Sequence, residues 1–515
     1  MNVHLLYQDR DFDENAPPPP GSEALIQDLG LDTLFAAMSQ GDALLSEVAR
    51  RVTLAWTTDI ETIRYRQGVL QDCMQGRAVF KEMHDLATDA IEAERKDIFG
   101  SLARSPSSVL FRSISLLESL TIVLVNIRRI ADEHVAGFQS EGLRTLLEMI
   151  RSELSDQYFA TIRGHLRRLR FSGGVLISAH LGEGNKGTDY VLREQSEPPG
   201  GLIALLFRPK APSCSFRISD QDEAGARALE ELRTRGLSLV ASALGRSTDH
   251  ILRFLTILRA ELAFYLGCVR LHDLLSARGH PVCFPQPAER QEHKLSATGL
   301  YDIGLALDTT TGVVANDVRA DAKDLVFLTG ANQGGKSTFL RSVGVAQLMM
   351  QCGMFVPAES FSSNVCERMF THFKRPEDPD MKSGKFEEEL GRMSSIADHL
   401  VPNSLILFNE SFAATNELEG SEIAEQIVNA LLERRIKVLF VTHQFELAYR
   451  FSSRGLPASL FLTAERRPNG TRTFKMIEGE PRRTSHGEDL YRQIFGGLRA
   501  GLAHEAQGEA QPESG

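Results

Sequence analysis

The stretch GANQGGKST, residues 330–338, places glycines ahead of a lysine and two hydroxyl residues at the spacing of a phosphate-binding loop. In such a loop the glycines let backbone N–H groups turn toward phosphate oxygens, and the start of the following helix adds partial positive charge. Lys336 would reach the outer phosphates, and Ser337 would ligate magnesium. The pattern therefore predicts that a nucleotide and Mg²⁺ are bound by the following residues: Gly330, Ala331, Asn332, Gln333, Gly334, Gly335, Lys336, Ser337 and Thr338.

Two apolar runs further along the chain end in polar residues that could act on that nucleotide. SLILFNE, residues 404–410, ends in Asn409 and Glu410, and KVLFVTH, residues 437–443, ends in His443. Because the carboxyl ends of parallel strands meet at one edge of a sheet, these residues are expected beside the phosphates. Glu410 would orient and deprotonate an attacking water, and His443 would donate to the γ-phosphate. The alternatives are structural: the glutamate would only cap the next turn, and the histidine would only satisfy a local contact.

Asn409 stands where nucleotide hydrolases usually carry an aspartate that helps to hold magnesium. Mg²⁺ keeps several waters and takes few direct protein ligands, so an amide can still orient a metal-bound water although it contributes no charge. Ser337 and Asn409 are therefore the candidate metal residues. Since Glu410 is retained, the sequence predicts slow but real hydrolysis.

Two regions of different character surround these motifs. Residues 23–290 show the apolar spacing of helices, with short β-type runs between about 170 and 218 that predict a small inserted sheet. GEGNKG, residues 182–187, joins two of these runs and does not lead from a strand into a helix, so a hairpin turn is expected instead of a dinucleotide-binding loop. In residues 291–500 strands alternate with helices, which is typical of an α/β domain with a mostly parallel sheet.

The composition is that of a soluble globular protein with several domains. The 515 residues are 42% hydrophobic and 24% charged, and their net charge of -11 argues against coating of nucleic acid by overall charge, although a local basic groove is allowed. Residues 1–22, which include four consecutive prolines, and residues 501–515 are predicted to be disordered tails.

The most apolar stretch, residues 108–127, contains an arginine, a glutamate and an asparagine, so we expect a buried helix and not a membrane span. The N-terminus has no basic segment followed by an apolar one, as a secretory signal would. The six cysteines are scattered, with no spacing typical of a disulfide framework or a zinc site. These features predict a cytoplasmic protein with reduced cysteines and no membrane partner.

Residues 315–490 resemble the ATPase domain of the MutS family of mismatch-repair ATPases. TGANQGGKST is similar to the family's T-G-x-N-x-G-G-K-S-T loop, with Gln333 where methionine is usual. GMFVPAES, FNESFAATNELEGSEIA and VTHQFEL resemble later segments of that domain, and FKMIEG with SHG resembles the tail that supports the family's dimer. The N-terminal half resembles the family's helical core and lever in character, with the small sheet at the place of the clamp.

The resemblance implies a multi-domain fold: an α-helical core and lever region with a small inserted β-sheet, followed by an ABC-type P-loop ATPase domain that uses ATP and Mg²⁺. It implies that Asn316 approaches the adenine. It also implies a homodimer in which SGKFEEEL, residues 383–390, contacts the partner subunit's nucleotide, although glycine stands at the family's serine position; the candidates are Ser383, Gly384, Lys385 and Phe386. The family's mismatch-recognition and connector domains have no room ahead of this core, so mismatch recognition is not expected.

The clearest basic feature is TIRGHLRRLRF, in which Arg163, Arg167 and Arg170 share one face if the segment is helical. These arginines could contact DNA phosphates, but a solvated helix face would have the same composition. Two hypotheses follow. The first is a homodimeric MutS-like ATPase that couples ATP binding and slow hydrolysis to DNA engagement. The second is a nucleotide-switched scaffold that binds a protein partner and turns over little ATP.

Overall fold

The computed structural model describes residues 1–100, 106–171, 174–185, 187–193, 215, 217–219, 221–309, 312–375, 384–467 and 471–481. Within these ranges the chain forms two compact units. We call them the helical unit, which comprises Met1–Val3, Ala78–Gln139 and Leu143–Leu262, and the sheet unit, which comprises His4–Arg77, Ser140–Gly142 and Ala263–Gly515. This division differs from the predicted boundary at residue 290, because residues 4–77 cluster with the C-terminal part of the chain.

A six-stranded sheet with the order β12-β11-β6-β10-β9-β8 forms the centre of the sheet unit. All its neighbouring strands are parallel except for the antiparallel pair β11 and β12. The strands are β6 (Leu325–Thr329), β8 (Met369–Phe373), β9 (Leu405–Asn409), β10 (Lys437–Val441), β11 (Ser459–Arg466) and β12 (Arg472–Glu478). In this order β10 lies between β6 and β9, and Val441 pairs with Leu328 on one side and with Asn409 on the other. The carboxyl ends of these three strands therefore lie side by side.

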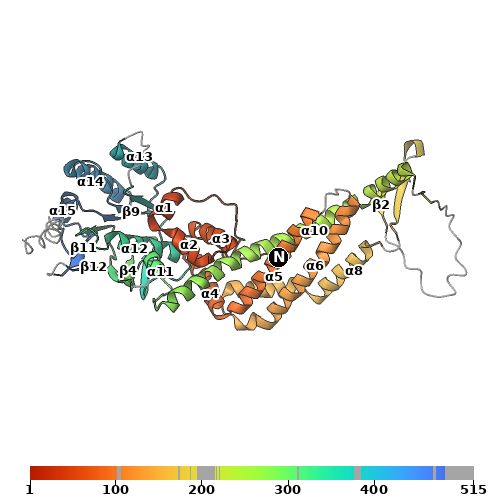
Figure 1. The fold of residues 1–515 in the computed structure, drawn as a ribbon, viewed down its shortest axis with the longest axis horizontal. Coiled ribbons are helices and arrows are strands. Elements are labelled where there is room, and N and C mark those ends of the chain that lie inside the picture. The colour runs from red at the N-terminus through yellow and green to blue at the C-terminus, as the bar shows by residue number, and fades with distance from the viewer. Residues whose placement is uncertain are drawn as a thin grey trace, which may run out of the picture. The chain divides into compact units, whose positions relative to one another are not determined.

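Helices cover both faces of this sheet (Figure 1). On one face Phe327, Phe408 and Phe440 pack with apolar residues of the helices α13 (Lys385–Ala397), α14 (Glu417–Glu433) and α15 (Phe445–Ser453). On the other face lies α12 (Lys336–Gln351), where a Cβ on Gly344 would come within 2.6 Å of the Leu407 side chain. The strands are apolar in both directions, as expected for a parallel sheet that is buried on both sides.

A second sheet of the same unit has the order β3-β7-β4-β5. Its strands are β3 (Gln286–Ala288), β4 (Leu295–Leu300), β5 (Asn316–Arg319) and β7 (Ser360–Asn364), with the helix α11 (Ile303–Asp308) and the short 3-10 helix Arg290–Glu292 in the connections. The sheet brings Tyr301 and Asn316 toward the loop that follows β6.

The prediction of a disordered tail before Ser22 is wrong for this structure. Leu5 and Leu6 are fully buried, and their carbonyl oxygens accept hydrogen bonds from Tyr265 Oη (2.6 Å) and Arg66 Nε (2.7 Å). The apolar start of the chain thus fills a space between helices that are distant in sequence. The prolines lead into the helices α1 (Ser22–Leu29), α2 (Leu31–Ser39), α3 (Ala43–Leu54) and α4 (Ile60–Gln75).

Long helices make up the helical unit: α5 (Arg77–Gly100), α6 (Pro106–His134), α7 (Glu141–Glu153), α8 (Asp156–Leu169) and the first part of α10 (Glu223–Ala277). By length and composition alone, residues 108–137 are long and apolar enough to cross a membrane. The charged residues within them had led us to expect that they would not meet this criterion. Leu117, Leu124 and Ile127 are nevertheless buried in the unit, as expected for a core helix.

The predicted inserted sheet is present in part. β1 (Ile177–Leu181) and β2 (Gly187–Leu192) form an antiparallel pair, and the GEGNKG segment connects them. The prediction that this segment forms a hairpin turn is therefore confirmed. Gly184 within it has a left-handed φ of 68°. The β-type run at 202–207, most of the one at 214–218, and the C-terminal tail lie outside the described residues.

Candidate functional site at the carboxyl ends of the central strands

The glycine-rich loop connects the end of β6 to the start of α12. Gly330 and Gly335 have φ values of +106° and +92°, which side chains rarely adopt. A Cβ on Gly334 would come within 2.7 Å of the Cβ of Ala464, so the neighbouring strand β11 leaves no space for a side chain. The loop geometry therefore requires glycine at these positions and brings backbone close to the start of a helix, where anions bind.

Lys336, the first residue of α12, points back over this loop. Its Nζ donates hydrogen bonds of 2.9 Å to the carbonyl oxygens of both Gly330 and Ala331, and the residue is only 4% exposed. Burial lowers the pKa of the ammonium group, and the nearby Glu410 carboxylate raises it. The lysine and the glutamate are therefore close enough to interact electrostatically.

The two candidate metal residues are in direct contact. Ser337 Oγ donates a 2.8 Å hydrogen bond to Asn409 Oδ1 at the end of β9. Mg²⁺ binds hydroxyl, amide and water oxygens, so this pair of oxygens is chemically suited to the ion.

Glu410 follows Asn409 in a left-handed conformation with φ of +55°, and its N–H donates to the carbonyl of Val441 in β10 (2.9 Å). This turn aims the carboxylate along the strand edge, where its Oε1 lies 4.0 Å from Nδ1 of His443. The side chains are 31% and 40% exposed, respectively, so both are accessible to a ligand.

A cavity of about 360 Å³ lies beside Glu410 and the glycine-rich loop, and neither Asn409 nor His443 is among the described residues that line it. Lys336, Ser337 and Glu410 line this cavity, and the aromatic residues Tyr301 and Phe474 line it as well. Sequence reasoning missed these two aromatic residues, because each belongs to a segment whose neighbourhood depends on the tertiary fold. The arrangement can accommodate a ligand with an anionic end and a flat apolar end.

Asn316 lines this cavity, and its side-chain amide forms hydrogen bonds with backbone groups of β12. Its Nδ2 donates to the carbonyl of Phe474 (3.2 Å), and its Oδ1 accepts from the N–H of Met476 (2.7 Å). The side chain thus joins β5 to β12. In this structure the side chain holds Phe474 in place beside the cavity, and the approach of Asn316 to an adenine stays a prediction.

The other predicted residues are placed as follows. Gln333 lies in the loop with φ of +61°, and its Oε1 accepts a hydrogen bond from Arg472 (2.8 Å). Thr338 lines the cavity. Gly384 and Lys385 begin α13, and Phe386 packs against the core of the sheet unit, so none of the three lines the cavity. Ser383 lies outside the described residues.

The three candidate DNA-contacting arginines belong to the helical unit and differ from one another. Arg163 and Arg167 are exposed on α8. Arg170 pairs with Glu118, whose carboxylate it approaches to 2.6 Å, and this contact raises the arginine's pKa. Its charge is therefore already balanced within the unit.

Two family models match the chain: the MutS2 N-terminal domain over residues 58–278 and MutS domain V over residues 326–493. The chain belongs to the MutS family. The second match contains the glycine-rich loop, Asn409, Glu410 and His443, whereas Tyr301 and Asn316, which also line the cavity of this MutS-family chain, lie outside both matches.

Among similar proteins, the DNA mismatch repair protein MutS of Thermus aquaticus is 33% identical over 186 residues, and that of Trichormus variabilis is 33% identical over 196 residues. Each alignment covers 36% of this MutS-family chain, and they cover 22% and 21% of the two relatives. The MutS protein of Synechocystis is 36% identical over 139 residues, which are 26% of this chain and 16% of that relative. The chain thus matches about a fifth of the length of these relatives.

Proposed function

We propose that the sheet unit is an ABC-type P-loop ATPase domain that binds ATP with Mg²⁺ and hydrolyses it slowly. The observation that carries the proposal is the convergence of Lys336, Ser337 and Glu410 on one cavity at the carboxyl ends of parallel strands. The adenine would lie beside the aromatic residues Tyr301 and Phe474, and the triphosphate would extend over the loop toward Lys336 and Ser337. The similarity to MutS domain V supports the same reading.

In the proposed reaction each residue has a defined task. The Lys336 ammonium would exchange its two carbonyl partners for the outer phosphate oxygens, which are stronger charge-assisted acceptors. Glu410 would accept a proton from the attacking water, whose oxygen forms a bond to the γ-phosphorus as the bond to the β–γ bridging oxygen breaks. His443, beside Glu410, would donate a hydrogen bond to the γ-phosphate.

Magnesium would be held by Ser337 and, directly or through a water, by Asn409. The ion would neutralise part of the charge on the phosphates. Because the asparagine amide is neutral, the proposed site attracts the ion less strongly than a carboxylate would. This is the physical reason for proposing slow turnover.

We further propose that ATP binding and hydrolysis are coupled to DNA engagement in a homodimer. The relatives are named as DNA mismatch repair proteins, which supports DNA as the partner, and the exposed Arg163 and Arg167 of α8 are suited to phosphate contact. In the dimer, residues 383–386 would reach the nucleotide of the partner subunit. Recognition of mismatches is not part of the proposal.

A nucleotide-switched scaffold that binds a protein and turns over little ATP is the second candidate. The net charge of -11 and the internal pairing of Arg170 with Glu118 favour it over a DNA-bound protein. Mobility-shift measurements with duplex, mismatched, branched and single-stranded DNA, at low and high salt and with and without ATP, separate the two. Salt-dependent binding to any of these DNAs supports the first candidate. Lack of binding at low salt with ATP present supports the second.

The ATP site itself is tested by calorimetric titration of wild type and Lys336→Ala with ATP and Mg²⁺. Loss of the lysine should weaken binding by roughly tenfold or more, because a charge-assisted interaction with the phosphates is removed. Lys323→Ala, which removes a lysine from the opposite end of β6, should bind like wild type. Equal affinity of wild type and Lys336→Ala would contradict the proposed site.

A further inference from the structure

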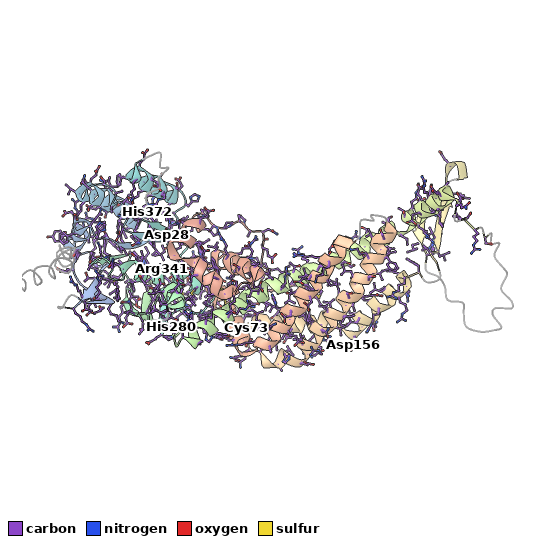
Figure 2. All side chains as sticks on the ribbon, in the orientation of Figure 1. Asp28, Cys73, Asp156, His280, Arg341 and His372 are labelled. Atoms are coloured by element: carbon purple, nitrogen blue, oxygen red, sulfur yellow. The ribbon has the colours of Figure 1, made fainter. Side chains whose placement is uncertain are left out.

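His372 of the edge strand β8, which Figure 2 labels, is fully buried. Its Nδ1 lies 2.7 Å from Ser411 Oγ, in the turn that follows β9, and its Nε2 lies 3.0 Å from the carbonyl oxygen of Glu389 in α13. A neutral ring protonated on Nε2 donates to the carbonyl of Glu389, and its Nδ1 is then an acceptor that shares the single hydroxyl proton of Ser411 with the backbone carbonyl of His372. Burial lowers the pKa of the ring to about 4, so it is neutral at physiological pH.

The turn that His372 contacts contains two residues in unfavourable conformations. Glu410 and Phe412 both have left-handed φ values, +55° and +61°, on either side of Ser411. Such residues persist only where surrounding contacts hold them. Ser411 Oγ also lies 2.5 Å from the backbone carbonyl of His372, and the imidazole ring stacks on Phe412 at 5.2 Å. The histidine therefore supports the turn that aims Glu410.

Glu389 approaches the same turn from α13. The residue is only 2% exposed, and neither oxygen of its carboxylate has a hydrogen-bond partner of regular geometry among the described residues, although the N–H of Phe412 lies near enough to interact with it. Burial raises the pKa of this carboxyl group, while Arg392 and the N–H of Phe412 lower it. A buried acid so incompletely satisfied requires an explanation beyond packing.

We propose that His372 and Glu389 are positioning residues that link α13 to the turn 410–412, so that a displacement of α13 changes the alignment of Glu410. The inference rests on the proposed function, in which Glu410 is the general base. It extends that function because the first residues of α13, Lys385 and Phe386, belong to the segment expected to meet the partner subunit's nucleotide. When the start of the helix contacts the partner subunit's nucleotide, the resulting displacement of α13 would change the position of Glu410. The displacement would be transmitted through Glu389, His372 and Ser411.

The test compares Ser411→Ala with Ser404→Ala. The two serines flank β9 at its opposite ends, both are 1% exposed, and each hydroxyl lies within hydrogen-bond distance of a backbone carbonyl, at 2.5 Å for Ser411 and 2.6 Å for Ser404. They differ in that only Ser411 contacts His372. The two variants therefore remove the same group with the same burial, and only one breaks the proposed link.

Hydrogen exchange of the α13 amides is measured first, in the nucleotide-free protein. Ser411→Ala should exchange roughly tenfold faster than wild type at α13, as expected for the loss of about one hydrogen bond, and Ser404→Ala should match wild type there. His372→Asn, whose shorter side chain loses the contact with Glu389, should also loosen α13. If α13 exchanges at the same rate in wild type, Ser411→Ala and His372→Asn, the link is refuted.

ATP affinity and single-turnover hydrolysis are then measured on the same proteins. Ser411→Ala should lower the hydrolysis rate roughly tenfold while its affinity for ATP stays within about twofold of wild type, because only the base is misaligned. Equal losses in Ser411→Ala and Ser404→Ala would show a general structural effect and overturn the proposal. If the wild-type protein fails to bind ATP, the proposed function is contradicted instead. The hydrogen-exchange rates of α13 would then still show whether α13 is linked to the turn 410–412.

Discussion

Ser337 Oγ and Asn409 Oδ1 lie 2.8 Å apart although 72 residues separate them in the chain. The contact brings together the hydroxyl at the start of α12 and the amide at the end of β9. It is the position at which the proposed magnesium ion would bind, and it has one neutral oxygen where a charged one is usual. Changes at this pair therefore test the metal chemistry without altering the loop.

Asn409→Asp should increase the apparent affinity for Mg²⁺. A carboxylate adds a full negative charge beside the ion, so half-maximal hydrolysis should be reached at a roughly tenfold lower Mg²⁺ concentration. Hydrolysis at varied Mg²⁺ and saturating ATP measures the effect. Asn403→Asp places the same charge near the other end of β9 and should leave the Mg²⁺ dependence unchanged. An equal Mg²⁺ response in all three proteins would rule out Asn409 as a metal residue.

His372 should make folding stability depend on pH. Its pKa is lowered to about 4, chiefly by burial and then by Arg392, from an ordinary value near 6.5. The unfolded chain therefore binds the proton more readily, and the contribution to stability is fully present above pH 6.5 and is lost as the pH falls toward 4. The difference is on the order of 3 kcal/mol. Urea unfolding of wild type and His372→Gln across this range should give a smaller loss in the variant; parallel curves would contradict the burial argument.

Arg163 and Arg167 of α8 should contribute more to DNA binding than Arg170, which follows the helix. Arg163→Ala combined with Arg167→Ala removes two exposed charges and should reduce the slope of log affinity against log salt by about two. Arg170→Ala should have a smaller effect for one residue, because this guanidinium is already paired with Glu118. Titrations of duplex DNA at several salt concentrations provide the slopes. A larger effect of Arg170→Ala than of either other single substitution would show that the pairing does not hold in solution.

The N-terminal residues should be essential for stability. Leu6 is fully buried, so Leu6→Ala should lower the free energy of unfolding by about 2–5 kcal/mol. Leu181→Ala, at a position that is 80% exposed, should have little effect. Chemical denaturation measures both. Similar stabilities of the two variants would mean that the start of the chain is not packed.

The sequence predicted the local parts of the site because each part is a contiguous motif. The glycine-rich loop and the polar ends of β9 and β10 could be recognised from spacing and hydrophobicity, and their meeting follows from the rule for parallel strands. The N-terminal segment could not be placed in this way, because its partner Tyr265 is 260 residues away from Leu5. From sequence alone, a short apolar run followed by four prolines resembles a disordered tail, because the burial of Leu5 and Leu6 depends on the tertiary structure.

The same limit applies to the polar contacts inside the sheet unit. His372 lies in an apolar run whose pattern predicts a strand. Nothing in that local pattern indicates that the histidine would contact Ser411 or Glu389. Nothing in the local pattern around Asn316 indicates that its amide would form hydrogen bonds with two backbone groups of β12. Side-chain partners of this kind are determined by strand register, which single-sequence patterns do not specify.

Single-turnover hydrolysis of ATP by wild type and Glu410→Gln tests the account most directly. Both proteins should bind ATP, because the glutamine preserves the cavity, but the variant should hydrolyse it roughly a hundredfold more slowly and retain it unhydrolysed, because the general base is absent. Glu433→Gln, which removes the same charge from the far end of α14, should behave as wild type. Equal rates in wild type and Glu410→Gln would contradict the claim that Lys336, Ser337 and Glu410 act together on one triphosphate.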